Sequence, residues 1–361
     1  MTHRPPLGME PAPTIARVAA EAGVSRATVS RAFGASHHLN PGTVATVRAV
    51  AARLGYVPNQ TARALSTGRT GNVALVVPDI TNPFFAALMR GAQARAREAG
   101  FAMFLGDSDE LPALEDELLA KLAAQVEGFV LVSPRITQER IRHHAARRPL
   151  VLVNSEVAGM ARLLVDTGPS YARAVEHLAD LGHRRVAYVS GPTLSWSNGQ
   201  RFAAVLAAAH KRGLHLTLFP AARPSFEAGR ACAEQLIDQG VTAALAFDDS
   251  VAQGIVAGLA ARAVTVPGDV SVVGCDGVIA ATTFPALTSI DARCTAAGER
   301  AVDLLLDLLR DPASADQRIT HPTDLVVRAS TARACPLPAR VAATLPRNPG
   351  PAASTLLESQ S

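Results

Sequence analysis

Short runs of apolar residues alternate, from residue 72 onward, with longer segments in which apolar side chains recur at helical spacing. The short runs are bounded by Gly, Pro or Asp, and such runs are typical of strands buried on both faces of a parallel sheet. Their alternation with helices predicts an α/β body of parallel sheets covered by helices. The expected strands are 73–77, 101–105, 128–132, 150–153, 186–190, 214–219, 243–247, 270–274 and 325–327. The expected helices are 84–99, 114–125, 171–181, 201–212, 226–239, 250–262 and 295–309.

Residues 14–58 show a different pattern, in which three apolar stripes recur at helical spacing. Gly23 supplies the residue that a tight turn favours after the first helix, and Ser25 can cap the second helix. Asn40 and Pro41 are a typical N-cap and first position for the third helix. The spacing predicts an all-α head with helix-turn-helix geometry, although an ordinary small helical bundle would show the same spacing.

The second helix of the head has two different faces. Val29 and Phe33, four residues apart, share the face that can pack on the first helix, which leaves Arg26, Ala27 and Arg31 pointing outward. A helix in the major groove reads base edges with residues near its N-terminus, so Arg26 suits guanine O6 and N7, and Ala27 suits a thymine methyl group. The residues of the head predicted to contact DNA are Thr14, Ser25, Arg26, Ala27, Thr28, Ser30, Arg31, Thr43 and Tyr56.

Positive charge is concentrated at the beginning of the chain. Residues 1–71 contain eight Arg and two Glu, a net charge of +6, whereas the remaining residues contain 27 basic and 29 acidic side chains, a net charge of −2. Phosphate binding requires such an excess in the head and a generic helical bundle does not, so the charge favours a nucleic-acid partner. The hydroxyl groups of Ser25, Thr28 and Ser30 suit the same phosphates.

A hinge segment, residues 59–71, follows the head. A very short helix capped by Asn59 is expected to present Arg63 and Leu65 before the flexible link 66–71. These three residues complete the predicted DNA-binding set. A helix of this length is not stable on its own.

Composition bounds the rest of the prediction. With 361 residues, 37.6 kDa, 48% hydrophobic and 18% charged residues, the chain is long and apolar enough to form two or three domains. Residues 1–13 have no signal-like apolar segment and no run is long enough to span a membrane, so we expect a cytoplasmic protein. The four Cys form no Cys-x-x-Cys pair, which predicts buried free thiols and no metal site. Residues 1–13 and 336–361 are expected to be disordered.

Three stretches resemble the LacI/GalR family of bacterial transcription repressors, namely residues 15–31, the Leu-Gly-Tyr-Val-Pro-Asn segment 54–59 and residues 77–85. The resemblance covers nearly the whole chain, and it departs from the family pattern at Gly34, where related heads often carry Asn. It implies a homodimer that binds double-stranded, pseudo-palindromic operator DNA on the nucleoid under the control of a small-molecule effector. It also implies that the hinge folds on the operator and that Leu65 wedges into the minor groove, which bends the duplex onto more protein.

The same resemblance implies how the body is divided. Residues 72–335 would form a hinged pair of α/β subdomains of the type I periplasmic-binding-protein kind, connected by three chain crossings. The N-subdomain would be residues 72–164 plus 292–323, and the C-subdomain residues 165–291 plus 324–335. The effector, favoured as a sugar or sugar derivative with a nucleoside or purine as the alternative, would occupy the cleft at the carboxyl ends of the strands.

Polar and aromatic residues follow several of the predicted strands. Arg201 matches the arginine that recurs most among effector contacts of the family, and Asp276 matches a frequent ligand contact. Phe84 can stack on a ligand but serves equally well as core, and Asn154 and Asp166 can contact a ligand or cap a helix. The residues predicted to contact the effector are Asp79, Asn82, Phe84, Asn154, Asp166, Ser195, Trp196, Ser197, Arg201, Asp248 and Asp276.

Two other functions are weighed against a repressor. An enzyme acting on a sugar would use Asp248, Asp249 and Asp276 as acid–base groups or metal ligands, but the phosphate-binding, nucleophile and paired-histidine motifs of enzymes are absent. One aspartate of the 248–249 pair is expected to be only a helix cap, and the family more often has Asn at the first position. A transport-associated binding protein would share the body but not the basic head. We therefore predict no catalytic residue, no cofactor and no metal.

Overall fold

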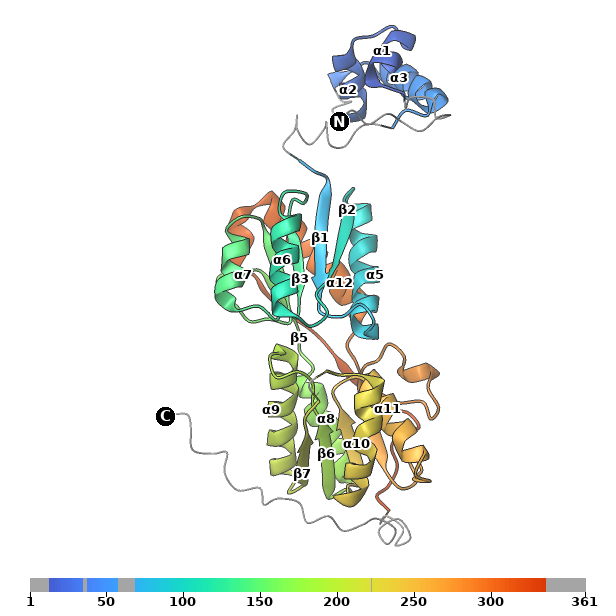
Figure 1. Cartoon of the computed structure of the whole chain (residues 1–361), viewed down its shortest axis with the longest axis vertical. Coiled ribbons are helices and arrows are strands. Elements are labelled where there is room, and N and C mark those ends of the chain that lie inside the picture. Colours follow the sequence, from blue (N-terminus) through green and yellow to red (C-terminus); the bar gives the residue numbers. More distant parts are fainter. Residues whose placement is uncertain (1–12, 35–37, 58–68, 222, 336–361) are drawn as a thin grey trace, which may run out of the picture. The chain divides into compact units, whose positions relative to one another are not determined.

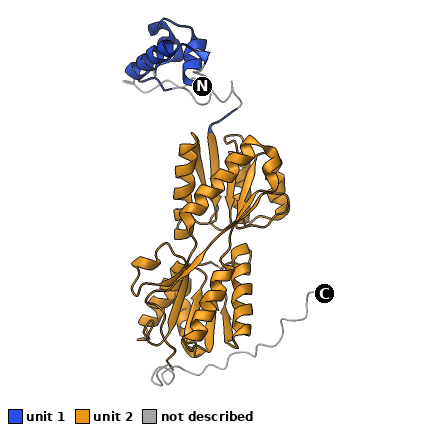
Figure 2. Cartoon of the chain, turned by 180° about the vertical axis from the view of Figure 1, so that it is seen from behind, with its two compact units in different colours: residues 1–71 blue, residues 72–361 orange. Residues whose placement is uncertain are grey.

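The computed structural model describes two units of the chain, residues 1–71 and residues 72–361 (Figure 2). The predicted disordered ends and the hinge residues Asn59, Arg63 and Leu65 lie outside the described residues. The described ranges are 13–34, 38–57, 69–221 and 223–335.

The first unit, called the head below, is built of three helices around a core of small side chains. Val18, Val29 and Val47, one from each helix, are fully buried, and Phe33 and Tyr56 pack against them. Burying one apolar face of each helix stabilises segments that are too short to be helical alone. The helices are α1 (Ile15–Glu21), α2 (Arg26–Gly34) and α3 (Pro41–Leu54).

The ends of these helices are fixed by the residues that the sequence indicates. Gly23 has φ +65° in the turn after α1, where a residue with a Cβ atom is strained. The Ser25 hydroxyl accepts the backbone N–H of Thr28 at 3.1 Å, and the Asn40 side chain accepts that of Gly42 at 2.8 Å. The predicted turn and caps of the helix-turn-helix are confirmed.

The second unit, called the body below, contains two six-stranded sheets, which Figure 1 shows one beyond the other along the chain's long axis. The N-subdomain sheet is parallel throughout, in the order β11-β5-β4-β3-β1-β2. Its strands are β1 (Asn72–Val77), β2 (Ala102–Asp107), β3 (Phe129–Val132), β4 (Leu150–Val153), β5 (Arg162–Val165) and β11 (Arg318–His321). The C-subdomain sheet has the order β12-β10-β9-β8-β6-β7, and only β12 runs antiparallel to its neighbour. Its strands are β6 (Arg185–Val189), β7 (His215–Phe219), β8 (Ala243–Ala246), β9 (Ser271–Asp276), β10 (Thr288–Asp291) and β12 (Asp324–Val326).

Helices cover both faces of each sheet, which is why the central strands are mostly apolar. In the N-subdomain, α5 and α12 cover one face, and α6 and α7 cover the other. In the C-subdomain, α10 and α11 cover one face, and α8 and α9 the other. The N-subdomain helices are α5 (Pro83–Glu98), α6 (Pro112–Leu122), α7 (Gln138–Ala145) and α12 (Cys294–Arg310). The C-subdomain helices are α8 (Gly168–Asp180), α9 (Trp196–Lys211), α10 (Phe226–Asp238) and α11 (Asp249–Ala260).

The chain passes between the two subdomains three times. It leaves the N-subdomain after β5, returns between β10 and α12, and crosses again between β11 and β12. Three neighbouring connections therefore lie between two separately packed cores, an arrangement typical of hinged domain pairs.

Pairs of glycines allow two helix pairs to approach closely. A Cβ atom on Gly91 of α5 or Gly298 of α12 would lie 2.0 Å from a backbone oxygen of the facing helix. The same is true of α10 and α11, where Gly229 and Gly254 would place Cβ atoms 2.1 Å and 2.0 Å from backbone oxygens. Because these oxygens belong to rigid helices, no side-chain movement can make room.

Gly298→Ala is expected to lower the free energy of unfolding of the body by about 1–3 kcal/mol, because the new methyl group forces α5 and α12 apart. Gly199→Ala in α9 is the matched control, since nothing lies within 4 Å of its Cβ position. The control is expected to raise stability by about 0.5–1 kcal/mol through helix propensity. Urea unfolding followed by circular dichroism measures both, and equal stability of Gly298→Ala and wild type would contradict the close helix contact.

The sequence analysis missed several elements of the body. α7 has only one strongly buried apolar side chain, Ile141, so its periodicity is weak. The four-residue strands β5, β10 and β11 contain Arg, Thr, Ser, Asp or His, so they lack the continuous apolar run by which a buried strand is recognised. Helix α9 begins at Trp196 and not at 201, because Ser195 caps it by accepting the N–H of Asn198 at 3.3 Å.

Candidate functional site

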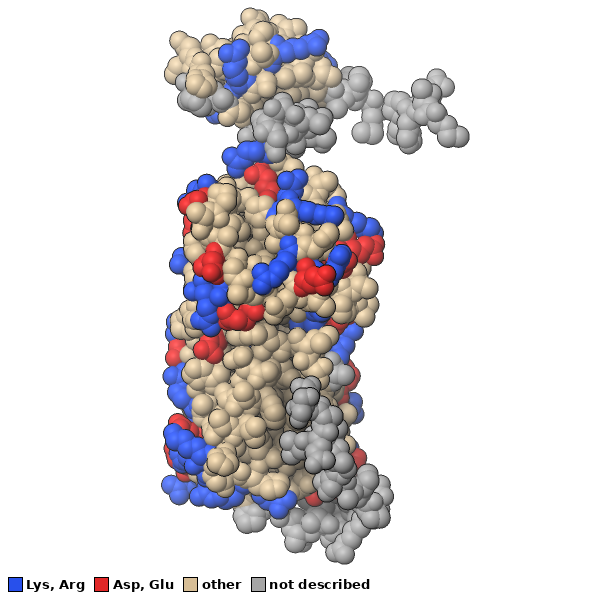
Figure 3. Space-filling model, turned by 90° about the vertical axis from the view of Figure 1, so that its left-hand side faces the viewer, with Lys and Arg blue, Asp and Glu red and all other residues tan. Residues whose placement is uncertain are grey.

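The exposed side of α2 in the head carries the predicted base-reading side chains. Arg26, Ala27, Ser30 and Arg31 are exposed, and Arg26 forms no ion pair among the described residues. Arg31 donates to the Ala27 carbonyl at 3.3 Å. On the face of the head visible in Figure 3, described Arg side chains appear and no described Asp or Glu does.

The only described acid of the head is already paired. Glu21 contacts Arg53 at 2.6 Å and Arg17 at 3.5 Å. The negative charge of Glu21 is therefore neutralised by arginines of α1 and α3, and it does not offset the positive charge of α2, which can attract a polyanion.

The other predicted DNA contacts of the head have structural duties. Thr14 caps α1 through a contact of 3.4 Å with the N–H of Arg17, and Ser25 and Thr28 share a hydrogen bond of 2.9 Å. Thr43 is half-buried on α3. Tyr56 packs against Phe33 with 6.1 Å between ring centroids, and burial raises its pKa. All five residues are exposed or half-buried, so these contacts within the head leave them accessible to a DNA partner.

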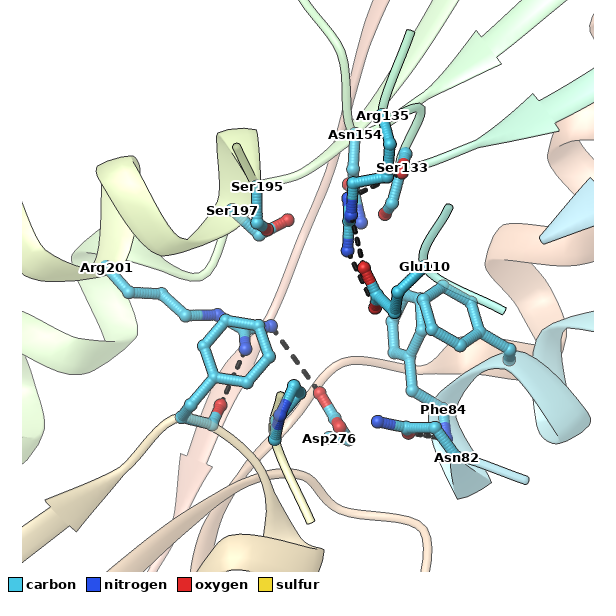
Figure 4. Close-up of a pocket in the computed structure, with 13 residues that line it drawn as sticks. Asn82, Phe84, Glu110, Ser133, Arg135, Asn154, Ser195, Ser197, Arg201 and Asp276 are labelled. Atoms are coloured by element: carbon cyan, nitrogen blue, oxygen red, sulfur yellow. Dashed lines mark hydrogen bonds and ion pairs between the residues drawn. The ribbon is translucent and has the colours of Figure 1, made fainter. Parts of the chain in front are cut away.

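A cavity opens between the carboxyl ends of the two sheets (Figure 4). Its lining comes from both subdomains and mixes aromatic rings with amide, hydroxyl and charged groups. This composition is typical of a site for a small polar ligand. The lining residues are Asn82, Phe84, Phe85, Glu110, Ser133, Arg135, Asn154, Ser195, Ser197, Arg201, Pro224, Phe247 and Asp276.

The structure gathers most of the predicted effector residues in this cavity. Those that line it are Asn82, Phe84, Asn154, Ser195, Ser197, Arg201 and Asp276. The remaining four are not among its lining residues. Asp79 holds the N–H and hydroxyl of Thr81, and Asp166 caps the start of α8 at 3.2 Å from the N–H of Gly168. Trp196 is half-buried in the first turn of α9, and Asp248 caps α11 through the N–H of Val251 at 2.8 Å.

Arg201 is the buried cation of the C-subdomain side. Its side chain is 5% exposed, and it donates to the Phe247 carbonyl at 2.6 Å and to the Thr167 hydroxyl at 3.1 Å. The Asp276 carboxylate lies 3.5 Å away, and the guanidinium carbon lies 4.5 Å from the centroid of the Phe247 ring. Burial by itself lowers the pKa of Arg201, but nearby Cys275, Tyr171 and Asp276 raise it overall, so the guanidinium stays charged.

Three buried carboxylates form a cluster with Arg201, in which Asp276 and Asp248 interact with Arg201 and Asp249 interacts with both of them. Burial raises the pKa of Asp276 to about 7 although Arg201 opposes the shift. Burial and the neighbouring Asp276 raise the pKa of Asp249 to about 8, and burial also raises that of Asp248. One cation among three buried acids means that part of this cluster holds protons at neutral pH.

Residues in the left-handed backbone region cluster at the cavity. The φ angle is 47° at Ser133 just after β3, 55° at Asn154 just after β4 and 100° at Asp276 at the end of β9. Glu110, which follows β2, has a φ angle of 61°. Each such residue costs of order 1–3 kcal/mol and persists only where its surroundings fix it. The clustering of strain at one cavity supports a binding role for it.

Sequence reasoning missed Glu110, Ser133, Arg135 and Phe247 as lining residues. Each follows a predicted or observed strand by a few positions, so the strand-end rule could have indicated them. Phe247 depends on Gly191, because a Cβ atom there would lie 2.5 Å from the Phe247 ring. Phe85 and Pro224 complete the missed set.

Polar contacts also join the two subdomains beside the cavity. The Asn82 amide donates to the Asp248 carboxylate at 3.0 Å, and Arg223 forms an ion pair with Asp109. Asn82 and Asp109 belong to the N-subdomain, whereas Asp248 and Arg223 belong to the C-subdomain. A ligand that enters the cavity can therefore change how the subdomains hold each other.

Known proteins match both units. Residues 14–59 match bacterial regulatory proteins of the lacI family, and residues 175–331 match the periplasmic binding protein-like domain. Catabolite control protein A of Streptococcus mutans is 32% identical over 305 residues, which are 82% of this chain and 91% of that protein. The chain belongs to the LacI family.

Solved structures agree with the fold of a LacI-family member. The lac repressor dimer bound to operator and the anti-inducer ONPF has a TM-score of 0.80 at 24% identity, covering 89% of this chain and 100% of that chain. The complex of the regulator CelR with cellobiose has a TM-score of 0.67 at 28% identity, covering 88% of this chain and 99% of that chain. The predicted family and the all-α head with a type I periplasmic-binding-protein-like body are confirmed.

Family membership decides between the functions weighed above. The chain is a DNA-binding transcriptional regulator of the LacI family and not an enzyme. None of the described helices is long and apolar enough to cross a membrane. All four cysteines are free, but Cys335 is exposed and Cys232 only half-buried, so the prediction of buried thiols is wrong for these two.

Proposed function

We propose that this LacI-family regulator is a dimeric repressor that binds a pseudo-palindromic operator and responds to a small effector, a sugar or sugar derivative, in the cytoplasm where the chromosome lies. The observation that carries the proposal is the cavity lined from both subdomains, next to a hinge of three chain crossings. A ligand there favours one closure of the subdomains, and that closure is coupled to DNA affinity. The coupling is reciprocal, so operator DNA changes effector affinity by the same factor.

The chemistry of the cavity supports a sugar or sugar derivative. Phe84 and Phe247 supply aromatic faces, while Asn154 and the Ser195 and Ser197 hydroxyls supply polar groups for ligand hydroxyls. Solved structures of LacI-family regulators contain cellobiose or ribose. These are ligands of those proteins, and they indicate the class of compound to test here.

Exposed apolar residues at one edge of the N-subdomain support a homodimer. Phe104 and Leu105 on the edge strand β2 are 38% and 51% exposed, and Leu111 just beyond it is 53% exposed. An edge strand with large exposed apolar side chains is expected to be covered by another chain. Two joined subunits would present two heads to two half-sites of the operator.

Selection of DNA from a random duplex library by the purified full-length protein tests the proposal. We expect an enriched sequence with two inverted half-sites, and a thermal-shift screen of sugars and nucleosides is expected to yield a ligand that changes its affinity. Failure to enrich any sequence at low ionic strength, with and without the screened ligands, would refute the repressor.

Arg26→Ala is expected to relax the base preference at one position of each half-site, with a loss of about 1–3 kcal/mol of discrimination. Arg17→Ala is the control, because it removes one charge from the same unit but from α1, where Arg17 pairs with Glu21. The control is expected to weaken binding equally for all sequences. Binding selection with both variants measures the preference, and an unchanged preference for Arg26→Ala would contradict its contact with a base.

A further inference from the structure

The cavity of the body contains four charged side chains among its described lining residues, two cationic and two anionic: Glu110, Arg135, Arg201 and Asp276. Both cations are already engaged. Arg201 faces Asp276 and a backbone carbonyl, as described above. Arg135 comes from the N-subdomain. Among the described residues its guanidinium forms an ion pair with Glu110 alone, while the buried Glu115 carboxylate accepts its backbone N–H at 3.0 Å.

The pair of Arg135 and Glu110 is close and two-pronged. Nε of Arg135 donates to Oε2 of Glu110 at 2.5 Å, and Nη2 donates to Oε1 at 3.0 Å. Nη1 donates to the Ser133 carbonyl at 2.6 Å. The side chains are 4% and 15% exposed, so water screens the pair only weakly. In Figure 4 the Glu110 carboxylate lies between the Arg135 guanidinium and the Phe84 ring.

The backbone holds Glu110 in this position. Asp109 and Glu110 both have positive φ, 48° and 61°, and the N–H of Glu110 donates to the Pro78 carbonyl at 2.7 Å. The Asp109 side chain pairs with Arg223 of the other subdomain. Two strained residues in succession indicate that the loop is fixed by its surroundings and that the carboxylate is preorganised.

We propose that Glu110 is a specificity-determining residue that masks the charge of Arg135 and restricts the cavity to uncharged ligands. The inference rests on the proposed function, because it names the ligand class of the effector site. An anionic ligand, phosphorylated or carboxylated, would find no guanidinium without a carboxylate partner and would add a negative charge beside Glu110 and Asp276. A neutral hydroxyl group loses nothing, since the pair offers it both an acceptor and donors. The site therefore discriminates against an anionic ligand through electrostatic repulsion by Glu110 and Asp276.

Inorganic phosphate is the probe that tests this inference. Its binding is measured by isothermal titration calorimetry on the full-length chain, at constant ionic strength set with chloride. We expect no measurable phosphate binding by wild type. Glu110→Gln keeps the shape of the side chain and frees the Arg135 charge, so its affinity for phosphate is expected to exceed the upper limit set by wild type at least tenfold. The double variant Glu110→Gln with Arg135→Gln is expected to lose the gained binding.

A matched control comes from another ion pair of the N-subdomain. Glu156 contacts Arg162 at 2.7 Å and Arg318 at 3.1 Å outside the cavity. Arg162 keeps Asp316 as a second partner, and Arg318 is half exposed, so water screens its charge. Glu156→Gln is therefore expected to gain no phosphate binding. If Glu110→Gln does not fold, as judged by circular dichroism and thermal melting, Glu110→Ala replaces it with the same expectation.

Two results would overturn the mask. One is phosphate binding by wild type that Arg135→Gln abolishes, and the other is a folded Glu110 variant that binds phosphate no better than wild type. Operator binding by the same samples separates this test from the proposed function. A wild type that binds no operator refutes the repressor and leaves the phosphate result standing, whereas normal operator binding without the phosphate gain refutes only the mask.

Discussion

Arg201→Met is expected to abolish effector binding and to lower the free energy of unfolding of the body by about 3–5 kcal/mol, the usual cost of removing one partner of a buried ion pair. The methionine removes the donor to the Thr167 hydroxyl and one of the two donors to the Phe247 carbonyl, which keeps the Tyr171 hydroxyl. It also leaves the Asp276 carboxylate without its cation. Denaturant unfolding measures the first effect, and titration with the effector found in the screen measures the second.

Arg262→Met is the matched control for this change. Arg262 lies in the same subdomain and pairs with Glu234 at 3.2 Å, but both side chains are substantially exposed. A surface pair of this kind contributes about 0–1 kcal/mol, so the control is expected to unfold and to bind ligand nearly as wild type does. Equal behaviour of the two variants would show that Arg201 is not the buried cation on which the site depends.

Asp249→Asn is expected to stabilise the body at alkaline pH and to do so less, or not at all, in acid. Asp249 is 2% exposed, its Oδ1 accepts the Ser289 hydroxyl at 2.6 Å, and its Oδ2 has no partner among the described atoms. Its pKa is raised from 3.8 to about 8, first by burial and then by Asp276. An amide at this position removes the buried charge and keeps the acceptor for Ser289.

The sign of the effect follows from proton linkage. Between its unfolded pKa of 3.8 and its folded value of about 8, the folded chain holds a proton that the unfolded chain has lost, so wild-type stability falls as pH rises through this window. The free energy of unfolding falls by about 1.4 kcal/mol per pH unit in this window, and above the folded pKa the penalty stays constant. Urea unfolding from about pH 5 to about pH 9 measures this, with exposed Asp238→Asn as the control. A stability difference between Asp249→Asn and wild type that does not change with pH would contradict the buried proton.

These two variants act on one cluster, which explains how the body can sense a small ligand. Arg201 faces Asp276, the charge of Asp276 acts on Asp249, and Asn82 reaches the neighbouring Asp248 from the other subdomain. A ligand that hydrogen-bonds Asp276 or Arg201 therefore acts next to a contact that joins the two subdomains. This proximity gives the ligand a physical means of favouring one closure over another.

The sequence by itself determined the features that local chemistry decides. Apolar periodicity separated the all-α head from the α/β body, and Ser25, Asn40 and Gly23 indicated caps and a turn that the structure contains, because capping and positive φ depend on neighbours in the chain. The charge excess of the head and the three family-like stretches were likewise readable without coordinates. For the cavity, strand-end position indicated Asn82, Asn154 and Asp276, and the family resemblance indicated Arg201.

Only the tertiary structure decided which charges meet. Glu110 and Arg135 are 25 positions apart. Nothing in the residues next to either of them shows that the left-handed backbone at Asp109 and Glu110 turns the Glu110 side chain toward Arg135. The pairing of Arg201 with Asp276, the glycine contacts of α5 with α12, and the short polar strands β10 and β11 depend in the same way on distant segments. The physical reason is that desolvation, ion pairing and close packing are properties of atoms brought together in space, whereas periodicity and capping are properties of the chain itself.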